Sequence, residues 1–199
     1  MSYQPKADEI KALREATQAP MMDCRKALVE AEGDIERAKT LLIERGAAQA
    51  QKKAERAANE GTVASYIHAG GKIGVLVEVN SETDFVARNP RFGELARDIA
   101  MHVAAMSPMY LDRESVPAEL VAAARDEFRA NVPAGKPPEV IEKIVEGKLN
   151  KWYEEKCLLD QPFVKDDSLT VGDLVSAAVG SLGENIRVRR FAKFALGEG

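Results

Sequence analysis

The sequence predicts an α+β fold, in which a small helical unit precedes a core of helices packed on a three-stranded antiparallel sheet. Two stretches of alternating apolar residues, 62–68 and 73–80, flank the turn sequence Ala-Gly-Gly-Lys, a pattern typical of a β-hairpin. Residues 186–194 form a third candidate strand at the end of the chain. Apolar residues at three- and four-residue steps predict helices over most of the remainder. The last strand is expected to pair with the hairpin, with the helices on one side of the sheet.

Composition narrows the class of protein. Hydrophobic residues make up 45% and charged residues 30% of the 199-residue chain, which is typical of a soluble globular protein. The net charge of −4 argues against binding nucleic acid through its phosphates. We find no long apolar run that would predict a membrane span and no apolar centre of a signal peptide in the first residues. Cys24 and Cys157 lie far apart and predict no disulfide framework, so we expect a cytoplasmic protein.

Three short helices are expected between residues 6 and 46, and we assign residues 1–50 to a separate three-helix module. Gly46 is expected to end the third helix in the C′ position. Residues 47–60 have good helix-forming composition and predict a helical connector to a core of residues 51–199. The apolar residues expected inside the module are Ile10, Leu13, Met22, Ala27, Leu28, Ala31, Ile35, Ala38, Leu41 and Leu42.

A short helix is expected directly after the hairpin, between Thr83 and Pro90. Thr83 can cap it through its hydroxyl, and Ser81 with Asp84 three residues later is an equally good cap. Pro90 disfavours a helical conformation at the residue before it, which limits the helix to about six residues. Phe85 then has two interpretations: it folds back into the core, as phenylalanine commonly does, or it is a wedge presented to a partner.

The core is predicted to contain longer helices and a basic last strand. Helices are expected to begin near Pro90, Pro117 and Pro137 or Pro138, and another after Thr170, which resembles a capping box with the aspartate three residues later. Residues expected to be buried in the helix after Pro117 are Leu120, Val121, Ala124 and Phe128. The basic residues of the last strand are Arg187, Arg189, Arg190 and Lys193. They form either a solvated face or a contact with a partner or a second copy.

Residue patterns for nucleotide, metal or nucleophile chemistry are weak. The chain has no phosphate-binding glycine loop, so we expect no bound nucleotide cofactor. Its two histidines, His68 and His102, fall short of the three or four clustered ligands of a zinc site. Cys24 with a distant histidine is a conceivable nucleophile pair. Its place on a small amphipathic helix favours a buried structural thiol.

Three separated motifs suggest a family. They are residues 13–17 (LREAT) with 21–28 (MMDCRKAL), residues 83–89 (TDFVARN), and residues 183–190 (GENIRVRR). These motifs resemble the signatures of the translation elongation factor Ts family, in the same order. The resemblance implies a ubiquitin-associated-like fold for residues 1–50 and the short family form with one core module. In the loop before Met21 this chain has Gln-Ala-Pro where the family usually has glycines.

The resemblance implies a guanine-nucleotide exchange factor for elongation factor Tu, not an enzyme. Thr83, Asp84, Phe85 and Val86 would dislocate magnesium from the partner GTPase, with Asp84 and Phe85 inserted between helices of its nucleotide domain. The first module would dock on the same domain through residues 21 and 22. Two adjacent methionines cannot both face inward, so at least one is expected at the surface, where adaptable methionine suits a binding site. The resemblance also implies a homodimer formed through the sheet.

The sequence leaves two other functions open. One is an adaptor that binds peptides or tags through the ubiquitin-associated-like module, with the rest as scaffold. It would bind partners without changing nucleotide release. The other is a thiol hydrolase that uses Cys24, whose activity alkylation would abolish.

Overall fold

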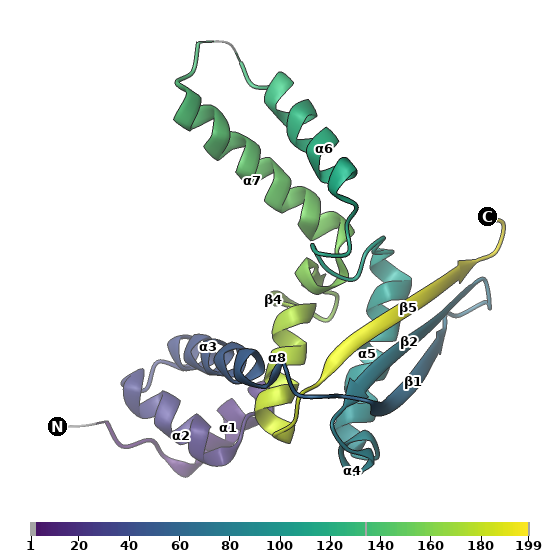
Figure 1. The fold of residues 1–199 in the computed structure, drawn as a ribbon. Coiled ribbons are helices and arrows are strands. Elements are labelled where there is room, and N and C mark those ends of the chain that lie inside the picture. The colour runs from purple at the N-terminus through teal and green to yellow at the C-terminus, as the bar shows by residue number, and fades with distance from the viewer. Residues whose placement is uncertain (1–2, 134, 199) are drawn as a thin grey trace.

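A three-stranded antiparallel sheet, in the order β1-β2-β5, lies on one side of the molecule, at the right in Figure 1. The computed structural model describes residues 3–133 and 135–198. The strands are β1 (Glu60–Ile67), β2 (Ile73–Ser81) and β5 (Arg187–Ala195). The helix α5 (Pro90–Met106) packs on this sheet, and α8 (Val171–Leu182) packs on α5. The predicted α+β class is confirmed, as is the antiparallel pairing of the last strand with the hairpin.

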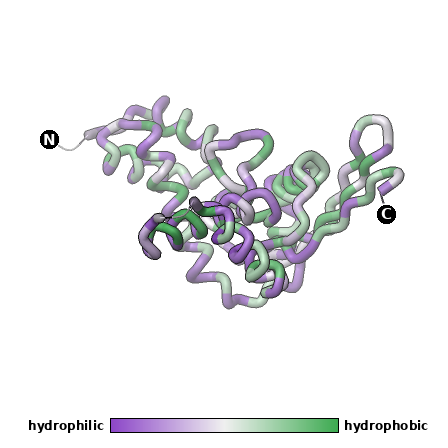
Figure 2. The backbone as a smooth tube through the Cα atoms, turned by 90° about the horizontal axis from the view of Figure 1, so that it is seen from above, coloured by the Kyte–Doolittle hydropathy of each residue, from purple (hydrophilic) through white to green (hydrophobic). Residues whose placement is uncertain are grey.

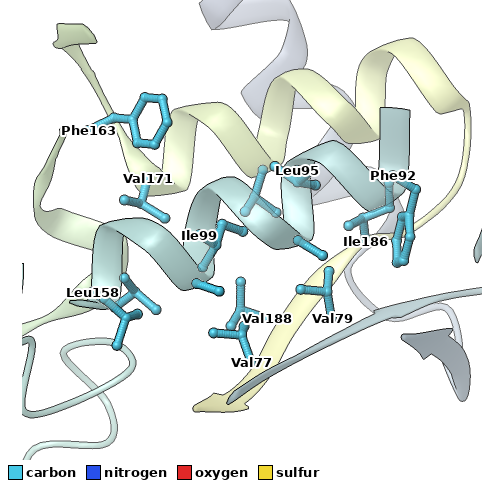
Figure 3. Close-up of a cluster of buried hydrophobic side chains, with 14 of the residues drawn as sticks. Val77, Val79, Phe92, Leu95, Ile99, Leu158, Phe163, Val171, Ile186 and Val188 are labelled. Carbon is cyan, nitrogen blue, oxygen red and sulfur yellow. The ribbon is translucent and has the colours of Figure 1, made fainter. Parts of the chain in front are cut away.

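One face of the sheet packs against α5 and forms the main hydrophobic core (Figure 3). Val75, Val77 and Val79 are buried because alternate side chains of a strand point to the same face. Phe92 and Ile99, seven residues apart and so on one side of the helix, cover them from above. Full burial of each such side chain stabilises the fold by about 1.5–3 kcal/mol. This core holds in place the sheet and the helices that pack on it.

The pairing of β2 with β5 contains a β-bulge. Glu78 pairs with Arg190 and Val79 pairs with Val188, so Arg189 is the extra residue. The Glu78 carboxylate lies 2.7 Å from the side chain of Arg190 and 3.5 Å from that of Arg189. The hydrogen bond with Arg190 lowers the pKa of Glu78. Two of the four basic residues in this strand are therefore paired within the sheet.

The amino-terminal helices enclose a second, smaller core. They are α1 (Ala7–Thr17), α2 (Met21–Glu30) and α3 (Ile35–Lys53). Their buried residues are Leu13, Cys24, Ala27, Leu28, Ala31, Ala38 and Leu42. Met22 and Ile35 were expected in this core and are instead 56% and 42% exposed. Both predictions were wrong: the two residues lie in the first turns of α2 and α3 and face solvent.

Gly46 does not end a helix, contrary to the prediction. It lies inside α3, which continues to Lys53, so the first half of the expected connector, residues 47–53, is the end of the same helix. Residues 54–59 are not helical, so that part of the connector prediction was wrong. A side-chain carbon on Gly46 would lie only 3.3 Å from the backbone oxygen of Ser176 in α8. One on Gly180 would lie 3.7 Å from the Cα of Gly46. The two glycines therefore allow α3 and α8 to cross closely, and this packing decides the role of Gly46.

The helices α6 (Ala118–Ala130) and α7 (Pro138–Lys156) form a hairpin that extends away from the sheet (Figure 1). Ala124 is buried as predicted, whereas Leu120 is 45% exposed and Val121 and Phe128 are only partly buried. These three predictions failed because two helices alone cannot enclose a full apolar stripe. Within the described ranges, no helix combines the length and the apolar character needed to cross a membrane.

A small second sheet between α7 and α8 was not predicted. A short 3₁₀ helix, η1 (Leu158–Asp160), leads into β3 (Pro162–Phe163) and β4 (Asp166–Thr170). His102 of α5 holds this segment from inside the core. Its Nδ1 accepts a hydrogen bond from the backbone N–H of Val164 at 3.2 Å, and its Nε2 lies 2.9 Å from Oε1 of Gln161. Since Nδ1 accepts, Nε2 donates, and the imidazole is held neutral.

Candidate partner-binding site

The short helix predicted after the hairpin is present as α4 (Asp84–Ala87). Thr83 is its N-cap, with an extended backbone and a hydroxyl that accepts from the backbone N–H of Val86 at 3.4 Å. Of the two caps left open by the sequence, the one through Thr83 is formed. The hydroxyl of Ser81 instead donates to the backbone oxygen of Thr83 at 2.9 Å. Asn89 caps the following helix, as expected from the proline after it.

Neighbouring residues of this helix face opposite directions. Val86 is 6% exposed and belongs to the main core, whereas Phe85 is 81% exposed. Of the two interpretations of Phe85, burial in the core is therefore excluded. Asp84 is also exposed and pairs with Arg88 at 2.9 Å, a surface contact of little energetic weight. The helix thus presents an aromatic ring and a carboxylate on a turn that one buried valine anchors.

Two glutamates tie this helix to the segment that connects α8 with the last strand. Glu184 accepts two hydrogen bonds from Thr83, one from its backbone N–H at 3.0 Å and one from its hydroxyl at 2.6 Å. Glu82 accepts from the backbone N–H of Asn185 at 2.6 Å. Sequence reasoning missed these contacts. Glu184 and Asn185 lie in the third motif, yet nothing in the sequence indicates that they meet a segment 101 residues away.

Met21 and Met22 lie at the start of α2 and are 46% and 56% exposed. The loop just before them contacts the helix that follows α4, because Nη2 of Arg91 donates to the backbone oxygen of Gln18 at 3.1 Å and also contacts its side-chain oxygen. Figure 1 shows α2 at the lower left and α4 at the lower right of the molecule, both away from the α6–α7 hairpin. The fold therefore places the two predicted contact regions, far apart in sequence, on the side of the molecule opposite that hairpin.

The thiols are not arranged for nucleophilic chemistry. Cys24 is completely buried, and its thiol lies 3.6 Å from the backbone oxygen of Ala19. Burial raises the pKa of Cys24 and raises the pKa of Cys157 to about 11. Since the thiolate is the reactive form, both groups are inert at neutral pH. Among the residues that the structure describes, no three histidine, cysteine or acidic side chains are grouped as metal ligands.

Comparison with known proteins identifies the family. A family model described as "Elongation factor TS" matches residues 8–198, nearly the whole chain. The chain belongs to the elongation factor Ts family. Relatives named Elongation factor Ts include those of Koribacter versatilis (strain Ellin345) and Geobacter sulfurreducens, each 56% identical. The aligned region covers 96% of this chain and 88% of the first relative, and 97% and 90% for the second. The Carboxydothermus hydrogenoformans elongation factor Ts is 53% identical, with 96% and 88% covered.

Proposed function

We propose that this member of the elongation factor Ts family is a guanine-nucleotide exchange factor for elongation factor Tu. The observation that carries the proposal is the exposure of Phe85, 81%, beside a buried Val86 on a capped turn. Aromatic side chains dominate the energetics of protein interfaces, and a backbone turn that is already held in place loses little conformational entropy on binding. Phe85 has the properties of a preformed wedge.

The proposed mechanism is displacement without covalent chemistry. GTPases hold the nucleotide through a magnesium ion that bridges phosphate oxygens. Insertion of Asp84 and Phe85 between helices of the partner's nucleotide domain would disturb that magnesium and phosphate site and loosen GDP. Thr83 and Val86 would support the two inserted residues. If this protein lowers the affinity of the GTPase for GDP, linkage requires that GDP lower the affinity of the GTPase for this protein by the same ratio. The tightest complex is therefore the nucleotide-free one.

The amino-terminal module, residues 1–50, would provide a second contact with the same domain. We propose that it has a ubiquitin-associated-like fold and docks through Met21 and Met22, whose flexible side chains adapt to a partner surface. Two linked contacts raise the effective concentration of the wedge at its target. Replacing both methionines with alanine is expected to raise the half-saturating concentration of factor while leaving the maximal exchange rate nearly unchanged. Titration of the factor against a fixed amount of GDP-loaded partner measures both quantities.

We further propose a homodimer that is formed through the sheet. The face of the sheet opposite α5 carries large exposed side chains, namely Val63, Ile67, Leu76 and Phe194. Figure 2 shows hydrophobic residues interspersed with hydrophilic ones along the strands near the C-terminus. Strands β1 and β5 are also the edges of this sheet, whose unpaired backbone groups favour further pairing. A second copy would cover both features.

The test of the main proposal is the release of a fluorescent GDP analogue from elongation factor Tu, with and without this protein. Acceleration at catalytic amounts of factor is the expected result. An adaptor would bind the GTPase or other partners and leave the release rate unchanged. Alkylation of the native protein is expected to leave exchange intact, because both thiols are buried. We expect the protein to act in the cytoplasm, without direct contact with nucleic acid or membrane and without a cofactor of its own.

A further inference from the structure

The helix that carries Phe85 is too short to be stable by itself. It has four residues, and forming the first turn of a helix is unfavourable without further stabilisation. Short helices commonly obtain it from a capping box, in which the carboxylate three residues after the cap accepts the cap's own backbone N–H. In α4 that position is occupied by Val86, an apolar residue that is buried in the core. The helix therefore lacks the capping carboxylate in its own sequence.

The same protein contains a complete capping box for comparison. At the start of α8, Oδ2 of Asp173 accepts from the backbone N–H of Thr170 at 2.9 Å and from its hydroxyl at 2.7 Å. At the start of α4, Glu184 accepts from the same two groups of Thr83 at 3.0 and 2.6 Å. The two sets of contacts match, although Asp173 is three residues from its threonine and Glu184 is 101 residues away.

We infer that Glu184 is a positioning residue for nucleotide exchange, which supplies, from the segment between α8 and β5, the carboxylate that caps the helix of the wedge. This arrangement leaves the third helical position free for Val86, the anchor in the core. It leaves the first and second positions free for Asp84 and Phe85, which face solvent. A capping box built within the helix would replace the anchor with an acidic residue. The inference deepens the proposed function and rests on it.

The contact is reciprocal and reaches a third segment. Glu184 binds the backbone N–H of the residue after Glu82, and Glu82 binds that of Asn185, the residue after Glu184. The side-chain amide of Asn185 donates to the backbone oxygens of Arg56 at 2.8 Å and Ala54 at 3.3 Å, at the end of α3. The base of the wedge is thereby tied to the helix that carries the amino-terminal module.

The experiment compares Glu184→Ala and Glu184→Gln with Asp173→Ala, which removes an equivalent capping carboxylate from a helix without the wedge. For Glu184→Ala we expect the maximal exchange rate to fall about two- to tenfold, the range that one net hydrogen bond is worth. The half-saturating concentration should change little. Glu184→Gln retains one acceptor oxygen and should recover part of the rate. Asp173→Ala should lower resistance to urea and keep the maximal rate.

Two further measurements separate positioning from a general loss of structure. In the free Glu184→Ala protein, the backbone amides of Val86, Ala87 and Arg88 should exchange hydrogen faster, while the urea midpoint should fall no further than that of Asp173→Ala, which loses equivalent hydrogen bonds. The double variant Phe85→Ala with Glu184→Ala should exchange no more slowly than Phe85→Ala alone, because Glu184 acts through the wedge. An additive loss would overturn the inference, as would an unchanged maximal rate or unchanged amide exchange in Glu184→Ala.

Failure of the proposed function is distinguishable from failure of the inference. A wild-type protein that does not accelerate GDP release contradicts the proposed function. The amide exchange of the free protein still decides whether Glu184 caps α4. Wild-type acceleration with an unchanged Glu184→Ala rate contradicts only the inference.

Discussion

The smallest scale at which function is visible is the contrast between Phe85 and Val86. Phe85 is 81% exposed and the adjacent Val86 only 6%, because only one side of this turn packs against the core. Truncating the exposed ring should cost the folded monomer little stability, whereas truncating the buried valine should cost much more. Phe92, one helix later, is completely buried and provides the natural comparison. The two aromatic residues should respond oppositely to truncation.

Phe85→Ala is expected to leave the free energy of unfolding nearly unchanged and to slow catalysed GDP release. A central aromatic hot spot is worth about 2–4 kcal/mol, and each ~1.4 kcal/mol is a factor of ten. Release at subsaturating factor should therefore fall about ten- to several-hundredfold if the whole loss appears in the transition state. Asp84→Ala should have a smaller effect. Stopped-flow release of fluorescent GDP and a urea titration measure the two quantities.

The control is Phe92→Ala, which should cost about 3–5 kcal/mol of folding stability because it empties a buried site. Adding EDTA provides a second check. Chelation removes the partner's magnesium, so the part of the Phe85 effect that acts through the metal should shrink. A Phe85→Ala protein that unfolds early, yet exchanges at the wild-type rate where folded, would contradict the wedge mechanism.

His102 predicts a dependence of stability on pH. Burial lowers the pKa of His102 below its usual value of about 6.5, although the bond to Gln161 partly opposes the shift. The unfolded chain therefore takes up a proton before the folded protein does, and stability should fall as pH decreases from about 6.5 toward the lower folded pKa. One proton corresponds to at most about 1.4 kcal/mol per pH unit. Urea titrations between pH 7.5 and 5 measure this slope.

The matched variants are His102→Gln and His68→Ala. The first should remove this part of the slope, since its side chain does not titrate. The second should keep it, because His68 lies on the surface and takes no part in the buried contact. A His102 signal that titrates by NMR at the unfolded value would contradict the prediction.

At the scale of elements, the crossing of α3 and α8 fixes the amino-terminal helices on the core. Gly46 and Gly180 let the two backbones approach, and the Arg91–Gln18 contact adds a second connection between the amino-terminal helices and the core. Residue 50 lies within α3, and the helix continues to Lys53. The placement of Met21 and Met22 relative to Phe85 therefore depends on this packing.

Gly46→Val should lower the free energy of unfolding, because the added carbons meet the backbone of Ser176 at the crossing. Gly147→Ala provides the contrast, since a side-chain carbon there meets nothing within 4 Å. In that exposed interior position of α7, alanine should stabilise by roughly 0.8–1 kcal/mol. Urea titration of the two variants beside the wild type measures both effects. Equal stability of Gly46→Val and the wild type would show that the crossing is not close.

At the scale of the whole molecule, the uncovered face of the sheet predicts association. Light scattering at micromolar concentration should give twice the 21.7 kDa mass of the chain. Reducing agent should not change this mass, because Cys24 and Cys157 are buried away from that face. The double variant Ile67→Glu with Phe194→Glu should be monomeric, since like charges would oppose each other across a two-fold interface.

Met109→Glu is the matched control, because Met109 is 62% exposed and lies outside the sheet. It should remain dimeric. A single species of one chain mass in the wild type would refute the dimer. A monomeric double variant with normal exchange at saturation would show that the wedge acts independently of dimerisation.

The sequence by itself determined the features that depend on neighbouring residues. The alternation of Val75, Val77 and Val79 specified the inner face of β2, since strand side chains repeat every two residues. The capping residue Thr170 and the proline after Asn89 specified where helices begin, because caps act within one turn. The exposure of at least one of two adjacent methionines followed from helix geometry alone.

Only the tertiary structure decided the features that depend on distant contacts. Gly46 has the properties of a helix terminator in sequence, and the approach of α8 makes it a crossing point instead. The sequence left two interpretations of Phe85, burial in the core or exposure as a wedge. The position of its turn at the edge of the core decides for exposure. Glu184 reaches Thr83 only because β5 pairs beside β2 and brings residues 101 positions apart together. Local patterns encode helices, strands and caps, whereas packing between them determines which side chains are left to meet a partner.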